Sequence, residues 1–464
     1  MQGRASPAAD FRSGGPATDG DIVKPGSLRP PVLIGAVLGL AAAVGLGLAQ
    51  NRGVLTAVTL DDAPRIVAVI IFIATYVVIA MGQLPRFQLD RPGAALLGAT
   101  LMVACGAISL GDAYKAIDFD TITLLLGMMI VIANLRLSGF FRLINSWAVT
   151  RAHHPLILLG AVVLLTGVLS AFLVNDAICL VMAPIIIELT RALKRNPVPY
   201  LIAIALASNV GSTATITGNP QNMIVGNLSH ITYGSFAAAL APVAAIGLVL
   251  TIVFVALLHP REYLTRERLD EPTLASHYHG WLVAKSALVT VAMVILFFVG
   301  QPVAKVAIVG GALLLLTRRV KAKKVYQEID GPLLLMFAGL FVVIAGIERS
   351  VLTPEVVANV ERLHLENTAM LTAVTAVLSN LVSNVPAVLA LKPFVAPLAD
   401  PQRAWLVIAM ASTLAGNFTL LGSVANLIVA QRAAAEGIEV SFWSYFRIGA
   451  PLTIATILIG VLLL

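Results

Sequence analysis

The sequence contains few charged residues. Asp, Glu, Lys and Arg make up 12% of its 464 residues, whereas soluble domains carry about 25%. Apolar residues make up 58%, and the mean hydropathy is +0.92. A large soluble protein would show charged faces between its apolar runs, and those faces are missing. The composition therefore excludes an ordinary soluble domain and predicts an integral membrane protein, whose helices need about 20 apolar residues each.

Cysteine and histidine are also scarce. The two cysteines, Cys105 and Cys179, lie within apolar runs, which excludes a disulfide framework or a cysteine metal cluster. The seven histidines lie in or beside the expected loops, so an intramembrane metalloenzyme would lack histidine ligands. We expect no enzyme activity, no catalytic residues and no cofactor other than a coupling ion.

Thirteen apolar spans run along the chain, and two of them have an unusual length. Residues 155–193 and 368–398 are too long for one crossing and too short for two, and each carries a polar break in its middle. A re-entrant helical hairpin explains both features, because its polar tip can stop at mid-membrane beside a cavity. The predicted fold is all-α, with about eleven transmembrane helices plus two re-entrant hairpins.

The loop charges predict the orientation. With the N-terminus in the cytoplasm, the cytoplasmic segments carry 20 Lys and Arg and the outer segments carry six. This bias, and not nucleic-acid binding, explains the net charge of +7. The basic run at 318–324 is the strongest cytoplasmic anchor. We expect a multi-pass protein of the inner (cytoplasmic) membrane with a cytoplasmic N-terminus.

The second half of the chain repeats the first. Residues 204–225 match residues 408–429 at nine of 22 positions, where chance gives roughly two or three. Residues 166–184 match residues 375–393 at seven of 19, and these matches include Thr, Ser, Asn and Pro. Each half has five crossings, an odd number, so the second half runs inverted relative to the first. Two inverted-topology repeats with broken helices indicate a secondary transporter with its site at the repeat interface.

The expected domain boundaries follow from the spans. Gly47-Leu48-Ala49 resembles a signal-peptide cleavage site, but the polar region before the first span is long for a signal peptide, which favours an uncleaved first helix. The predicted parts are a disordered cytoplasmic tail (1–31), a first helix and loop (32–64), repeat 1 (65–258), a cytoplasmic linker (259–279) and repeat 2 (280–464).

Four polar islands interrupt the apolar spans, two at hairpin tips and two within long helices. They are Val174-Asn175-Asp176, Thr217-Gly218-Asn219-Pro220-Gln221-Asn222, Ser383-Asn384-Val385-Pro386 and Gly422-Ser423-Val424-Ala425-Asn426. Gly and Pro allow the backbone to unwind, which exposes carbonyl groups to a cation and helix N-termini to an anion. The predicted substrate and ion site comprises Asn175, Asp176, Gly218, Asn219, Gln221, Asn222, Ser383, Asn384, Gly422, Ser423 and Asn426.

Two of the charged residues within the hairpins are functional candidates. Asp176 is the one carboxylate expected at mid-membrane depth, and such a residue is a functional candidate because its burial is costly. It is predicted to bind a proton or, with Asn175 and Asn222, a sodium ion. The alternative is an aspartate that only caps the hairpin tip. Lys392 either attracts an anionic substrate or extends toward the outer surface.

The four islands, in this order, resemble those of the ion-transporter superfamily over about residues 60–464. That group includes arsenite pumps, sodium/proton antiporters, citrate permeases and divalent-anion/sodium symporters. The sequence is most similar to the bacterial anion permeases with a citrate-transporter-like domain. The resemblance implies elevator-type transport, often by homodimers, with substrate and cation held by the hairpin tips and the unwound helices.

The hairpin tips differ from those of one branch. The dicarboxylate/sodium symporters carry Ser-Asn-Thr at both tips, whereas the tips here read Val174-Asn175-Asp176 and Ser383-Asn384-Val385. A tip aspartate is more similar to the arsenite pumps and antiporters. The substrate class and the coupling ion therefore stay open.

The sequence thus predicts a secondary active transporter of a small anion, coupled to a proton or sodium gradient. The anion is an oxyanion such as arsenite or a carboxylate such as citrate. The alternatives are a sodium/proton antiporter and an anion channel. The expected partners are the anionic substrate, membrane lipid and a second copy of the chain, with no nucleic acid.

Overall fold

A computed structural model of the chain describes residues 63–84, 89–149, 153–265, 278–317, 320–351 and 364–464. These residues belong to one compact unit, Leu48–Leu464. The predicted tail and the predicted helix before residue 50 lie outside the described residues, as does most of the predicted linker.

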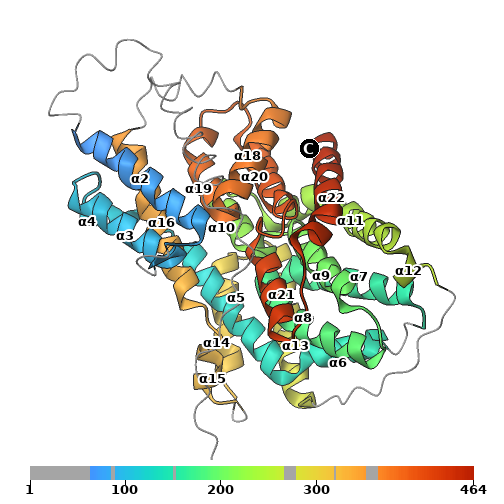
Figure 1. Cartoon of the computed structure of the whole chain (residues 1–464). Coiled ribbons are helices and arrows are strands. Elements are labelled where there is room, and N and C mark those ends of the chain that lie inside the picture. Colours follow the sequence, from blue (N-terminus) through green and yellow to red (C-terminus); the bar gives the residue numbers. More distant parts are fainter. Residues whose placement is uncertain (1–62, 85–88, 150–152, 266–277, 318–319, 352–363) are drawn as a thin grey trace, which may run out of the picture. The chain divides into compact units, whose positions relative to one another are not determined.

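The described residues of the first half are almost entirely helical (Figure 1). One short hairpin of two strands, β1 (Gln83–Leu84) and β2 (Leu89–Asp90), lies between its first two helices. The helices are α2 (Ala63–Met81), α3 (Arg91–Ala104), α4 (Leu110–Ala116), α5 (Phe119–Ser138), α6 (Phe140–Val149), α7 (Pro155–Phe172), α8 (Asn175–Ala192), α9 (Pro197–Ser212), the 3-10 helix η2 (Ile216–Gly218), α10 (Pro220–Ser229), α11 (Tyr233–Leu258) and α12 (Pro260–Tyr263).

The second half is helical as well. Its helices are α13 (Gly280–Phe298), α14 (Val303–Leu315), α15 (Ala322–Tyr326), α16 (Gly331–Ser350), α18 (Thr368–Val382), α19 (Asn384–Val395), α20 (Pro401–Ala415), α21 (Val424–Ala435) and α22 (Phe442–Leu463). Six described helices are long and apolar enough to cross a bilayer, namely α5, α7, α11, α13, α16 and α22. The predicted all-α membrane fold is confirmed.

One predicted span ends early. The apolar run over residues 92–110 predicts a single helix, but α3 ends at Ala104 and the short α4 begins at Leu110. Gly106 has a φ of +78°, a conformation that glycine adopts without steric cost and that ends a helix. Ser109 then accepts a hydrogen bond from the Asp112 amide and caps α4.

The repeat extends beyond the two segments that match in sequence. The starts of α8, α9 and α10 are related to the starts of α19, α20 and α21 by the offsets of the two sequence matches. The starts of α3 and α5 are related to those of α14 and α16 by a further offset, which is the same for both pairs. The helix beginnings therefore follow the repeat even in α3, α5, α14 and α16, where the sequence comparison found no match.

These four helices form two equivalent crossings, and we call α2, α3, α5, α14 and α16 the frame. α3 lies beside α16, and α5 lies beside α14 (Figure 1). A Cβ added at Gly127 would lie 2.5 Å from the Ala307 carbonyl carbon, and one added at Gly339 would lie 2.7 Å from the Ala95 carbonyl carbon. Glycine is required at both crossings because the backbones touch there.

The first hairpin, α7 and α8, opens on the side where α11 ends. The His154 Nε2, just before α7, lies 2.8 Å from the Thr265 carbonyl oxygen. The Arg195 Nε, just after α8, lies 3.9 Å from the Glu262 Oε1. Both ends of the hairpin therefore meet the chain just after α11, and its tip points away from that side.

The second hairpin, α18 and α19, opens on the opposite side. α18 and α20 lie side by side with their C-terminal ends together. Ser379 and Asn380, near the end of α18, donate hydrogen bonds to the carbonyl oxygens of Ser412 and Ala415, near the end of α20. α19 returns over a short connection to the start of α20. That start shares a groove with Ala238 near the beginning of α11, the end of α11 that lies away from the first hairpin's opening. The two hairpins therefore enter from opposite sides, as an inverted repeat requires.

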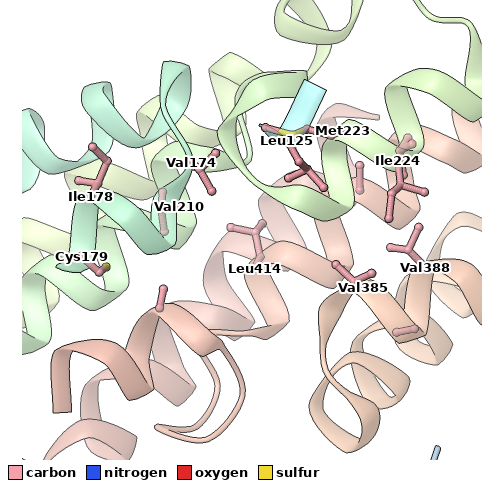
Figure 2. Packing of buried hydrophobic residues seen from close by; sticks show 14 of the residues in the cluster. Leu125, Val174, Ile178, Cys179, Val210, Met223, Ile224, Val385, Val388 and Leu414 are labelled. Carbon is pink, nitrogen blue, oxygen red and sulfur yellow. The ribbon is translucent and has the colours of Figure 1, made fainter. Parts of the chain in front are cut away.

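A continuous apolar core joins the hairpins to the broken helices. Figure 2 shows Ile224 of α10 opposite Val385 and Val388 of α19, and it shows Val174 at the tip of the first hairpin. All four side chains are at most 7% exposed. This packing holds the hairpin tips next to the breaks in α9–α10 and α20–α21.

Candidate functional site

Each of the four predicted polar islands contains the beginning of a helix. α8, α10, α19 and α21 begin there, and residues from all four N-termini line one cavity of about 40 Å³, room for a few water molecules. The lining residues are Ile79, Arg91, Asn175, Asp176, Pro220, Gln221, Leu333, Met336, Phe337, Ser383, Asn384, Val385, Pro386, Ser423 and Val424. Helix N-termini carry unpaired N–H groups and positive partial charge, so their convergence favours an anion.

The tip of the first hairpin places an asparagine and an aspartate at the cavity. Asn175 is 2% exposed, and its Nδ2 donates a hydrogen bond to the Asn209 Oδ1 at 3.0 Å. Its own Oδ1 has no hydrogen-bond partner within the described part of the chain. Asp176 is half-buried, and its carboxylate makes no hydrogen bond or ion pair with the described residues. The tip therefore presents the Asp176 carboxylate at the cavity, while the Asn175 Oδ1 is buried without a partner among the described residues.

At the tip of the second hairpin, the equivalent side-chain oxygen has a hydrogen-bond partner. The Asn384 Oδ1 accepts a hydrogen bond from the Ser379 Oγ at 2.8 Å. Ser383 precedes it with a φ of +79°, which is rare for a residue other than glycine, asparagine or aspartate. Tyr76 of α2 donates its hydroxyl to the Pro386 carbonyl oxygen at 3.0 Å and joins this tip to the frame.

The break between α9 and α10 is held by asparagine side chains. The Asn222 Nδ2 donates to the carbonyl oxygens of Ser212 and Thr215, both at 3.0 Å. The Asn219 Oδ1 caps α10 by accepting from the Asn222 amide at 2.8 Å. A Cβ at Gly218 would lie 2.2 Å from the Ser212 carbonyl oxygen, so only glycine fits there. These groups satisfy the carbonyls that unwinding exposes.

The break between α20 and α21 repeats the arrangement. The Asn426 Nδ2 donates to the carbonyl oxygens of Gly416 and Thr419, at 2.8 and 3.2 Å. Ser423 caps α21 by accepting from the Ala425 amide. A Cβ at Gly422 would lie 2.9 Å from the Gly416 carbonyl oxygen. Asn222 and Asn426 thus perform the same structural role in the two repeats.

Two further positions connect the repeats, and the sequence comparison missed them. The Asn209 Nδ2 donates to the Asn417 Oδ1 at 2.8 Å and to the Asn426 Oδ1 at 3.1 Å. The Thr413 Oγ1 accepts from the Gln221 Nε2 at 3.0 Å. Asn209 and Thr413 are repeat-equivalent, but their residue types differ, so a search for identities could not find them. A search for polar residues at equivalent positions would have done so.

The predicted site residues divide into two groups. Six of them line the cavity: Asn175, Asp176, Gln221, Ser383, Asn384 and Ser423. Gly218, Asn219, Asn222, Gly422 and Asn426 do not line it and instead hold the two breaks. Asn222 uses its amide group for the break and for Thr413, so it is not directed into the cavity beside Asp176, as the predicted sodium site would need.

Two basic residues were not part of the predicted site. Lys392 was expected to attract substrate or to extend toward the outer surface; its Nζ lies 3.0 Å from the Glu348 Oε1 near the end of α16, and it does not line the cavity. Arg91 was counted only as a loop charge, yet it lines the cavity. The pattern of apolar spans gave no signal for this, because Arg91 lies at a span boundary.

The comparison with known sequences agrees with this arrangement. The profile of the citrate transporter family, CitMHS, matches residues 67–415, which include both hairpins and the break between α9 and α10. The chain belongs to the citrate transporter family. Its expected resemblance to the ion-transporter superfamily is confirmed.

Relatives of this chain are named as transporters, but their names differ in the substrate they indicate. An uncharacterised transporter of Mycobacterium tuberculosis is 30% identical over 426 residues, covering 86% of this chain and 97% of the relative. The silicon efflux transporter of Oryza sativa subsp. japonica is 28% identical, covering 82% and 93%. A transporter named arsB in Dictyostelium discoideum is 25% identical, covering 84% and 90%. The chain is therefore a multi-pass membrane transporter.

One solved structure shows the same fold. The YdaH transporter of Alcanivorax borkumensis superimposes with a TM-score of 0.54 and 14% sequence identity, covering 86% of this chain and 97% of that one. At this identity the likeness concerns the fold alone.

Proposed function

We propose that this citrate transporter family member is a secondary active transporter of a small anion, driven by a proton or sodium gradient. The observation that carries the proposal is the convergence of four helix N-termini on one cavity between two hairpins that enter from opposite sides. The positive ends of the helices attract an anion. Asp176, which has no partner among the described residues, supplies a group that binds a proton or a cation.

The cavity size bears on the substrate class. A space of about 40 Å³ holds only a few water-sized groups. It favours a small oxyanion over a carboxylate as large as citrate in this conformation. The names of the silicon efflux relative and the arsB relative support the same preference.

An elevator motion suits the division of the molecule. The hairpins and broken helices, α7–α10 and α18–α21, form one group around the cavity. Polar links from this group to the frame include Tyr76 with Pro386 and Lys392 with Glu348. Because such links are individually weak, the hairpin group can slide along the frame and present the cavity to either side.

Uptake measurements test the proposal. Purified protein in proteoliposomes is given arsenite, citrate, succinate or sulfate, with the pH and sodium gradients varied separately. We expect saturable uptake of at least one anion that follows one gradient. Sodium and proton exchange without any of these anions would identify an antiporter, and unsaturable conductance would identify an anion channel.

We also propose that the protein lies in the inner membrane with its N-terminus in the cytoplasm. Lys321 and Gln301 then face the cytoplasm and the outside, respectively. Single cysteines at these two positions, in a background without Cys105 and Cys179, test the orientation. A membrane-impermeant thiol reagent added to intact cells should label position 301 and not position 321, and the reverse pattern would refute the orientation.

A further inference from the structure

The proposed function leaves one cavity residue without a role. Arg91 begins α3, directly after the cap residue Asp90, whose carboxylate accepts from the Gly93 amide at 2.9 Å. The Arg91 Nε donates to the Ile79 carbonyl oxygen at 3.1 Å, and this bond fixes the base of the guanidinium against the end of α2. A guanidinium has five N–H donors. The other four have no partner in the described part of the molecule.

The lining of the cavity is otherwise nearly uncharged. Among its described lining residues, Arg91 is the one base and Asp176 is the one acid. No ion pair joins the two side chains, although both line the same space. The free donors of Arg91 and the N-termini of four helices therefore border the same space.

The repeat shows that Arg91 is an asymmetric feature. Arg91 is the first residue of α3, and its equivalent is Val303, the first residue of α14. The two crossings that hold these helices, at Gly127 and Gly339, are alike in both repeats. The two helix crossings of the frame are therefore alike, but only the crossing of α3 with α16 has a cationic residue at its repeat-equivalent position, and this residue lines the cavity.

We propose that Arg91 binds the negative charge of the substrate from the frame side and gives the two faces of the protein different affinities for it. This inference rests on the proposed function. A guanidinium binds a carboxylate or oxyanion with two parallel hydrogen bonds. The affinity is higher at the face where α3 and α16 begin, which is the predicted cytoplasmic face. The bound form of the substrate is the ionised one.

Sided kinetics with Arg91→Gln test the inference. Uptake of citrate, sulfate and arsenite is measured in right-side-out and inside-out membrane vesicles. For an ionised substrate, KM at the face where α3 begins should rise about 10- to 100-fold, the effect of losing a hydrogen bond to a charged group. KM at the other face should not change. Arg447→Gln, an exposed arginine of α22 outside the cavity, is the matched control and should leave both values unchanged.

Charge restoration separates a binding role from a structural one. Arg91→Cys is made in a background in which Cys105 and Cys179 are serine. A thiol reagent that attaches an ammonium group should restore transport, whereas one that attaches a sulfonate should not, although both react. Equal restoration by the two reagents would overturn the inference, as would an unchanged KM in Arg91→Gln.

The remaining outcomes distinguish the inference from the proposed function. Arsenite is mostly the uncharged acid at neutral pH. If the protein takes up arsenite alone, at equal rates in the wild type and in Arg91→Gln, then Arg91 does not have the proposed role, but the protein is still a transporter. If the wild-type protein neither takes up any of the anions nor gains thermal stability from them, the proposed function and the inference both fail.

Discussion

The two hairpin tips have the same backbone plan but differ in how their polar groups are satisfied. In the second, Ser379 donates to the Asn384 Oδ1. The equivalent atoms of the first, the Ser170 Oγ and the Asn175 Oδ1, both lack partners within the described residues. The first tip also carries Asp176 where the second carries Val385. The asparagine oxygen of the second tip thus has a partner, whereas the first tip has two buried polar atoms without one in the described part of the chain and adds a carboxylate.

Leaving buried polar groups unpaired has a cost. A buried donor or acceptor without a partner loses about 1–3 kcal/mol. The second hairpin has unpaired atoms too, the Thr375 Oγ1 and the Asn380 Oδ1, but its tip asparagine is satisfied. At the cavity itself the two tips differ by one ionisable group, because Asp176 lines it from the first tip and Val385 lines it from the second. We therefore propose that the coupling step takes place at the first tip.

The largest effect is expected from Asp176→Asn. This change keeps the size and one carbonyl oxygen but removes the ability to ionise, so binding of the coupling ion no longer depends on the gradient. Concentrative uptake into proteoliposomes should fall to background, while a thermal-shift assay should show a folded protein. Glu188→Gln, an exposed carboxylate on the same helix α8, is the control. Full concentrative transport by a folded Asp176→Asn protein would mean that the aspartate is only a cap.

A smaller effect, equal in the two repeats, is expected at the crossings of the frame. Gly127→Ala and Gly339→Ala each place a methyl group against a backbone closer than 3 Å. Such overpacking costs about 1–3 kcal/mol, so both variants should unfold at a lower denaturant concentration than the wild type. Gly234→Ala, where nothing lies within 4 Å, should not be destabilised. A loss of stability in only one of the two variants would show that the two crossings are not energetically equivalent, although their backbones approach to similar distances.

The smallest effect concerns the two serines. Ser379→Ala removes the single hydroxyl hydrogen that the Asn384 Oδ1 and the Ser412 carbonyl oxygen share. Hydrogen bonds between helices in a membrane contribute about 0.6–1.7 kcal/mol, so stability should fall by about this amount. Ser170→Ala removes a hydroxyl that has no described partner and should leave the unfolding free energy nearly unchanged. Equal losses in denaturant unfolding would contradict the distinction between the tips.

Much of this fold could be read from the sequence because apolar length and polar interruptions are local signals. The break at Asn175 and the break at Asn384 each lie in the middle of an overlong span, and both proved to be helix beginnings. The internal matches predicted the repeat, and the odd number of crossings in each half predicted its inversion. The end of α3 was missed, because Gly106 terminates the helix by its backbone conformation and leaves hydropathy unchanged.

The site was harder to predict because it depends on the direction of each side chain as well as on the position of the residue in the sequence. Asn222 and Gln221 are neighbours in one motif, yet Gln221 lines the cavity and Asn222 holds the break. Arg91 comes from the frame, far from every motif. Such differences arise from which way a side chain points after the helices pack. The domain boundaries, the homodimer and the coupling ion stay predictions.

The two crossings of the frame also bear on how the chain is assembled during synthesis. α5 packs against α14, and α3 packs against α16, so these two helices of the first half find their partners in the second. When the first half enters the membrane, Gly127 of α5 and Ala95 of α3 do not yet have the backbones that they contact in the finished protein. Both helices lack these partners until α14 and α16 are inserted. The frame is therefore completed only after the second half of the chain has been inserted into the membrane.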